Sequence, residues 1–107
     1  MKSAPRPKRR LSEAFIILHE TDAGHGRYSI DLGPAQAELT YRVLAPDLIS
    51  ADHTFVPPAM RGTGAAAALV ERLVADARAD GRRIRPRCSY VEAMRRRHPE
   101  WADVFAS

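Results

Sequence analysis

A change of hydrophobic period at two closely spaced glycines constrains the fold of this chain more than any other feature. Before Val56, apolar residues alternate with polar ones, which is the pattern of half-buried β-strands. After Gly64 they recur along one face of a helix: Ala66, Leu69, Val70, Leu73, Val74 and Ala77. Gly81 suits the left-handed residue that closes such a helix. The chain must therefore join a sheet to a long amphipathic helix through a glycine-rich turn.

Four strands are predicted before the glycines, over residues 14–18, 27–32, 37–43 and 48–56. The turn residues 22–26 separate the first two strands, which favours a hairpin. Pro57 and Pro58 end the fourth strand, because proline has no N–H to donate to a neighbouring strand. An antiparallel meander is the simplest way to connect these strands.

The last third of the chain predicts one more strand and a second helix. Residues 83–87 form the fifth strand, and Ser89 with Glu92 has the spacing of a capping box at the start of a helix that runs toward His98. Pro99 ends that helix, and a last turn then packs three apolar side chains onto the body: Trp101, Val104 and Phe105. The predicted fold class is α+β, a mixed α/β domain of four antiparallel strands, helix, strand and C-terminal helix.

Length and composition exclude several classes of protein. A chain of 107 residues has room for one domain, and no apolar run approaches the ~20 residues that cross a bilayer. The basic, proline-containing start does not have the form of a secretory signal. Cys88 is the only cysteine, which leaves no internal disulfide and no multi-cysteine zinc site. We expect a cytoplasmic protein with no bound metal.

The charge is divided unevenly along the chain. Residues 1–10 contain five basic residues and no acidic one, so we predict a disordered basic arm over residues 1–12 and a single domain over residues 13–107. Residues 11–60 hold two basic and seven acidic residues, whereas residues 61–107 hold ten basic and six acidic. Such a body can bind an anion on one side and attract a cation on the other. It lacks the basic stripe with interleaved aromatics of a nucleic-acid-binding surface, so binding by the arm alone is the weakest of the functional hypotheses.

The junction of strand and helix has the chemistry of an anion site. In the run Arg61-Gly62-Thr63-Gly64-Ala65, two glycines allow a tight turn that brings backbone N–H groups close to a ligand. The first turn of the helix adds unpaired N–H groups and the positive end of its dipole, and Arg61 adds a full charge. Gly-x-Gly also occurs in ordinary turns, and this run lacks the Gly-Lys-Ser/Thr of a P-loop.

This junction resembles the pyrophosphate loop of the GNAT superfamily of acyl-CoA-dependent N-acetyltransferases. More narrowly, the chain is similar to small single-domain YjdJ-type acetyltransferases. The blocks that carry this second resemblance are His53-Thr54-Phe55-Val56-Pro57, Arg61-Gly62-Thr63-Gly64, residues 85–91 and Arg97-His98-Pro99-Glu100. The resemblance covers residues 28–105, and the agreement of separated blocks in order is more specific than any single block.

The resemblance implies that residues 48–56 and 83–87 splay apart into a cleft for acetyl-CoA, which donates an acetyl group to an amine. The pantetheine arm of coenzyme A would lie along Phe55 and Val56. The N–H of Val56 is a candidate donor to the developing oxyanion. The pyrophosphate would be held by the loop: Arg61, Gly62, Thr63, Gly64, Ala65 and Ala66. The remaining phosphates would meet basic residues of the second half, with Arg97 as the main candidate and Arg61, Arg95 and Arg96 as the others. The acceptor is a small-molecule amine, or a protein lysine or N-terminus.

Two residues are candidates for catalysis, each with a structural alternative. Cys88 either protonates the leaving thiolate or carries the acetyl group, and its alternative is a small buried core residue. His53 would accept the proton of the amine, and its alternative is a histidine hydrogen-bonded within the sheet. Tyr90 is a second candidate acid. Because no acid/base pair is unambiguous, a non-catalytic acyl-CoA-binding or regulatory module remains the alternative function, and the oligomeric state stays open.

Overall fold

A computed structural model describes residues 10–33 and 35–106 of the chain. The elements follow in the order η1 (Leu11–Ala14), β1 (Leu18–Asp22), β2 (His25–Asp31), β3 (Gln36–Ala45), β4 (Leu48–Phe55), η2 (Pro58–Met60), α1 (Ala65–Asp80), β5 (Arg83–Pro86), α2 (Ser89–Arg97) and η3 (Pro99–Trp101). The five strands form one sheet in chain order, with β1 to β4 antiparallel and β5 parallel to β4. The predicted mixed α/β class and the meander are confirmed.

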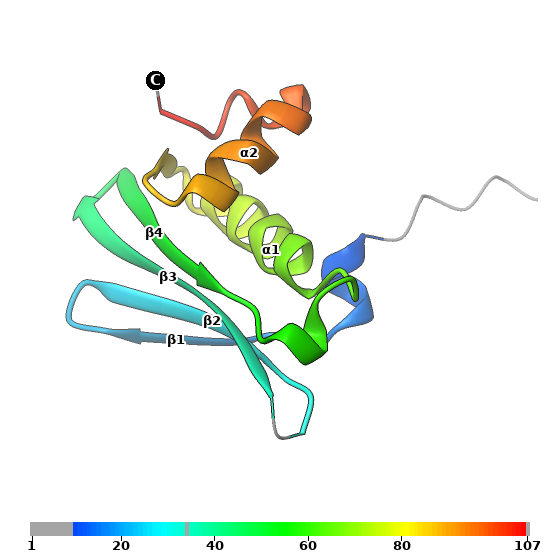
Figure 1. Ribbon diagram of the computed structural model, residues 1–107. Coiled ribbons are helices and arrows are strands. Elements are labelled where there is room, and N and C mark those ends of the chain that lie inside the picture. Colours follow the sequence, from blue (N-terminus) through cyan, green and yellow to red (C-terminus); the bar gives the residue numbers. More distant parts are fainter. Residues whose placement is uncertain (1–9, 34, 107) are drawn as a thin grey trace, which may run out of the picture.

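Both α-helices pack on the same face of the sheet (Figure 1). Of the predicted apolar face of α1, five residues are buried in the core and Ala66 is half-buried: the five are Leu69, Val70, Leu73, Val74 and Ala77. Ala65 and Ala68 are buried as well. This face packs against apolar side chains of the central strands, among them Tyr28, Ile30, Ala37, Leu39 and Tyr41. Burying each leucine or valine contributes roughly 1.5–3 kcal/mol, so the amphipathic pattern fixes which way α1 faces. Gly81 closes the helix at φ 69°, as predicted.

Strands β4 and β5 separate after a short parallel ladder. Their pairing runs from Leu48 with Arg83 to Ala51 with Pro86. Beyond it, the carbonyl of Ala51 accepts hydrogen bonds from the N–H groups of both Arg87 and Cys88, at 2.9 and 3.0 Å. The chain then turns into α2 while β4 continues to Phe55, so the two strands diverge as the resemblance implied.

A β-bulge lies at the same point of β4. Thr40 pairs with His53 and Tyr41 with Ala51, which leaves the backbone of Asp52 without a paired residue on β3. A bulge bends a strand and increases its twist. The bulge therefore bends β4 where it leaves β5.

The first strand was predicted in the wrong place. We expected a strand over residues 14–18, but β1 begins at Leu18, and Leu11–Ala14 form the 3₁₀ helix η1. The N–H groups of Leu11 and Ser12 donate to the carboxylate of Glu71 on α1, which holds η1 against the helix. The apolar run therefore does not mark a buried strand, and Ile16 is 94% exposed. Of the predicted basic arm, residues 1–9 lie outside the described residues.

The predicted capping box is wrong as well. Helix α2 begins at Ser89 and its N-cap is Cys88, so Ser89 is one position too late to cap the helix. Glu92 instead forms ion pairs with Arg95 and Arg96 farther along α2, at 2.6 and 3.3 Å. Opposite charges three and four residues apart lie on one face of a helix, which explains this choice of partners.

The C-terminal turn covers the free edge of β5. Trp101, Val104 and Phe105 are buried, as predicted, and Phe105 forms a parallel bridge with Ile84. The edge of the short strand β5 is therefore protected by the end of the chain. In the part of the chain that the structure describes, no helix has the length and apolar character needed to cross a membrane.

Candidate active site

A cavity of about 530 Å³ opens where the end of β4, the glycine loop and the starts of α1 and α2 meet. It is lined by Thr54, Val56, Met60, Arg61, Gly62, Gly64, Ala65, Ala66, Ala67 and Tyr90. Six of these were among the predicted coenzyme-binding residues: Val56, Arg61, Gly62, Gly64, Ala65 and Ala66. The divergence of β4 from β5 creates the room for this cavity, because the end of β4 pairs with β3 but has no strand on its β5 side.

The glycine loop presents only some of its amides to a ligand. Gly62 and Gly64 adopt φ 81° and 88°, in the left-handed region that other residues rarely adopt. Three loop N–H groups already have acceptors: Arg61 donates to the Pro58 carbonyl (3.2 Å), Thr63 to the Met60 carbonyl (3.3 Å) and Ala65 to the Thr63 hydroxyl (3.3 Å). Within residues 10–33 and 35–106, the amides of Gly62, Gly64 and Ala66 have no such acceptor. The free amides thus alternate with occupied ones along the loop.

Little side-chain volume covers the loop. A Cβ added at Gly62 would meet no atom within 4 Å, and one added at Gly64 would meet the side chain of Leu11 at 3.5 Å, an ordinary contact. The alanines of the first turn of α1 keep the entrance of the cavity open. Because the first N–H groups of a helix carry its positive partial charge, the uncovered surface at the start of α1 suits an anionic group.

Two arginines add positive charge around the cavity. Arg61 lines it, and Arg97, at the end of α2, acts electrostatically on the half-buried Tyr90. Burial raises the pKa of Tyr90 and the charge of Arg97 partly opposes that rise. Neither arginine forms an ion pair with any residue that the structure describes, unlike Arg95 and Arg96, which pair with Glu92. Arg61 and Arg97 are thus the cations free to meet a phosphate here.

Cys88 lies beside the cavity, at the N-terminus of α2. Its thiol is 3.5 Å from the hydroxyl of Thr54, which lines the cavity from β4. Burial raises the pKa of the Cys88 thiol, but the Thr54 hydroxyl and the nearby backbone of Val91, Tyr90 and Thr54 outweigh burial, so that the pKa lies below its ordinary value. A lowered thiol pKa is typical of a reactive cysteine, whereas packing against the hydrophobic core, which Cys88 also shows, is typical of a structural one.

His53 and Phe55 lie on the other face of β4. Successive side chains of a strand point to opposite faces, so Thr54 faces the helices while its two neighbours face away from them. His53 and Phe55 are both exposed, and neither lines the cavity. The structure therefore brings Cys88, Thr54 and Tyr90 together but leaves His53 on the opposite side of the sheet.

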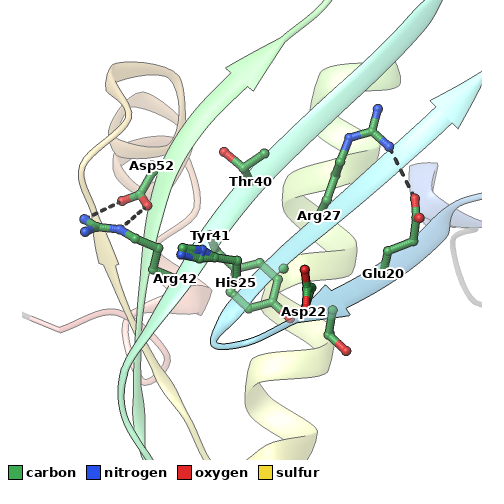
Figure 2. Close-up of a pocket in the computed structure, with 10 residues that line it drawn as sticks. Glu20, Asp22, His25, Arg27, Thr40, Tyr41, Arg42 and Asp52 are labelled. Atoms are coloured by element: carbon green, nitrogen blue, oxygen red, sulfur yellow. Dashed lines mark hydrogen bonds and ion pairs between the residues drawn. The ribbon is translucent and has the colours of Figure 1, made fainter.

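A second cavity, of about 520 Å³, lies on the helix-free face of the sheet (Figure 2). Four of its charged side chains already pair with one another: Arg42 with Asp52 at 2.7 Å, and Arg27 with Glu20 at 3.3 Å. Asp52 also accepts a hydrogen bond from the buried Ser50. Burial raises the pKa of Asp52, but these partners outweigh it and hold the pKa below the usual range. The glycine loop does not line this cavity.

Comparison with known families identifies the class of protein to which this fold, with its glycine loop between β4 and α1, belongs. Residues 27–104 match the family described as GCN5-related N-acetyl-transferase. The chain belongs to this family. The match includes every candidate site residue named above.

One solved structure similar to this chain is that of a GCN5-like putative N-acetyltransferase from Staphylococcus aureus, determined by NMR in solution. The two share 23% sequence identity and superpose with a TM-score of 0.61, over 84% of this chain and 88% of that one. At this identity the likeness shows a shared fold. No curated protein matches the chain.

Sequence reasoning missed three residues that line the cavity: Thr54, Met60 and Ala67. The sequence did contain a pattern that could have identified Thr54: the alternation of side chains along a strand places it on the same face as Val56 and opposite to Phe55. Ala67 belongs to the first turn of α1, and like Ala66 it is half-buried and lines the cavity. Met60 had no signal, since its place depends on the 3₁₀ turn η2.

Proposed function

We propose that the chain is a cytoplasmic, acetyl-CoA-dependent N-acetyltransferase of the small single-domain YjdJ type. The observation that carries this proposal is the cavity at the β4–α1 junction, with its free amides on Gly62, Gly64 and Ala66. Family membership supports acyl transfer in general terms.

The residues around the cavity fit the parts of coenzyme A. The free amides and the start of α1 suit the pyrophosphate, and Arg61 and Arg97 suit the remaining phosphate charge. Beyond Ala51, β4 pairs with β3 but no longer with β5, so its free edge near Phe55 and Val56 can hydrogen-bond the extended pantetheine arm as an added strand would. The amides of Thr63 and Ala65 already donate hydrogen bonds within the loop. These two residues would therefore contact the coenzyme through their other atoms.

Bound acetyl-CoA would supply an activated thioester at the divergence of β4 and β5. The N–H of Val56 would stabilise the developing oxyanion. In a direct transfer, the amine nitrogen bonds to the acetyl carbon, the bond from that carbon to sulfur breaks, and Cys88 or Tyr90 gives the leaving thiolate a proton. In a two-step transfer, the Cys88 thiolate bonds to the acetyl carbon and coenzyme A leaves as a thiolate, which Tyr90 protonates; the amine nitrogen then bonds to the same carbon and Cys88 leaves as a thiolate.

His53 would receive the proton of the attacking amine. Because its side chain lies on the helix-free face, it acts only on an amine that enters from that side, through the opening between β4 and β5. The acidic first half of the chain favours a cationic acceptor there. The acceptor would be a small-molecule amine, or a lysine or N-terminus of a protein.

The alternative is a non-catalytic acyl-CoA-binding or regulatory module. One observation favours it: His53 and Cys88, the two candidate catalytic residues, lie on opposite faces of β4. Such a module would bind acetyl-CoA in the same cavity without accelerating transfer.

Calorimetry with acetyl-CoA tests binding, and release of free coenzyme A in the presence of a panel of amines tests transfer. We expect binding, and release that depends on the amine and falls in the His53→Ala and Cys88→Ala variants. Intact mass spectrometry after mixing with acetyl-CoA separates the two chemical routes: an acetyl group on Cys88 supports the two-step transfer. Binding without release from any amine would support the module, and absence of binding would refute both functions.

A further inference from the structure

The sulfur of Cys88 has a polar partner from another element. Cys88 lies where β5 ends and α2 begins, and Thr54 lies on β4 beyond the point where the two strands separate. Their side chains nevertheless meet, with the sulfur 3.5 Å from the threonine oxygen. This contact spans 34 residues of sequence and links the end of β4 to the start of α2 at the edge of the cavity.

A threonine hydroxyl serves both protonation states of a thiol. It accepts a hydrogen bond from S–H, and after a rotation about its C–O bond it donates one to S⁻. Hydrogen bonds to an ionised acceptor are about twice as strong as those between neutral groups. The hydroxyl therefore stabilises the thiolate more than the thiol, and it fixes the direction in which the sulfur points.

We propose that Thr54 is a positioning residue that orients the sulfur of Cys88 toward the cavity and favours its thiolate form. The proposal rests on the function proposed above, and it selects between the two roles of Cys88. A thiolate has no proton to give to a leaving group, so the contact favours Cys88 as the carrier of the acetyl group. The role of acid then falls to Tyr90, whose hydroxyl keeps its proton because burial raises its pKa.

Alkylation of the thiol tests this contact and needs no coenzyme. Because Cys88 is the only cysteine of the chain, all modification of a thiol is modification of Cys88. The rate of modification by iodoacetamide is followed by intact mass spectrometry from pH 5 to pH 10, and its midpoint gives the pKa of the thiol. Thr54→Val removes the hydroxyl with little change of shape, and Thr54→Ser keeps it. Thr40→Val is the matched control, since Thr40 lies on β3, pairs with His53 and faces away from Cys88.

We expect Thr54→Val to raise the midpoint and to slow alkylation at pH 7 by roughly tenfold, the effect of losing one hydrogen bond to a charged group. The rate above the midpoint should be unchanged, which separates ionisation from access. Thr54→Ser and Thr40→Val should follow the original profile. A Thr54→Val profile identical to the original would overturn the proposal, and Thr54→Ala gives the same comparison if Thr54→Val does not fold. Loss of acetyl-CoA binding, measured separately, would count against the proposed function and leave this result intact.

Discussion

A single acidic substitution in the glycine loop offers a quantitative test of the coenzyme site. Gly62→Asp places a carboxylate beside the free amides, in space that no atom within 4 Å occupies. A carboxylate about 5 Å from a phosphate charge costs about 3 kcal/mol at an effective dielectric constant of 20. Because the loop is exposed, we take about 2 kcal/mol after screening, which weakens binding roughly 30-fold.

The control is Gly81→Asp, at the other end of α1. Gly62 and Gly81 have φ 81° and 69°, and neither would bring an added Cβ within 4 Å of another atom. Both substitutions therefore carry the same left-handed strain, roughly 1–2 kcal/mol of stability, but only the first lies at the cavity. Calorimetry with acetyl-CoA, with melting temperatures measured in parallel, should show weaker binding in Gly62→Asp alone. Both variants should be destabilised, Gly81→Asp the more so, because a carboxylate is unfavourable at the C-terminal end of a helix dipole. Equal affinities in the two variants would refute a phosphate site on this loop.

Three further outcomes follow from the structure. Gly26→Ala should destabilise the fold by roughly 1–3 kcal/mol, read from urea unfolding, because a Cβ there would overlap the ring of Tyr41; an unchanged midpoint would contradict that packing. Arg97→Ala should weaken acetyl-CoA binding several-fold, with a smaller salt dependence, whereas the ion-paired Arg96→Ala should not, and equal effects would remove Arg97 from the site. The pKa of Asp52 is lowered in the folded state. Its contribution to stability is therefore present above the pKa of this group in the unfolded chain, and it is lost as the pH falls through the folded pKa. Asp52→Asn should make the free energy of unfolding depend less steeply on pH below about pH 4.

The sequence predicted the elements whose pattern is long and regular. The helix face from Ala66 to Ala77 and the closing residue Gly81 follow from local geometry, since a 3.6-residue period and a left-handed glycine leave few alternatives. The hairpin of β1 and β2 and the order of the sheet follow from turn residues and short connections. The divergence of β4 from β5 rested on family resemblance, because no local pattern specifies where two strands part.

The errors came from tertiary contacts that local patterns do not contain. The apolar run at residues 14–18 has the composition of a strand, but the contact of η1 with Glu71 shifts the start of β1 to Leu18. The capping box failed because the hydrogen bonds of Arg87 and Cys88 to β4 set the point at which α2 can begin. Strand alternation predicts that His53 and Thr54 lie on opposite faces of β4. It does not predict which of these faces the helices cover, because that depends on packing.

The chain-order sheet described above has a consequence for how the protein assembles. Neighbouring strands β1 to β4 meet through short hairpins, which close quickly and at small entropic cost. The parallel pairing of β4 with β5 can form only after α1, which connects them, has packed on the sheet. The cavity exists only after that step. We therefore expect the ligand-binding junction to be the last part of the molecule to form, so that the onset of coenzyme affinity during refolding marks the arrival of the native state.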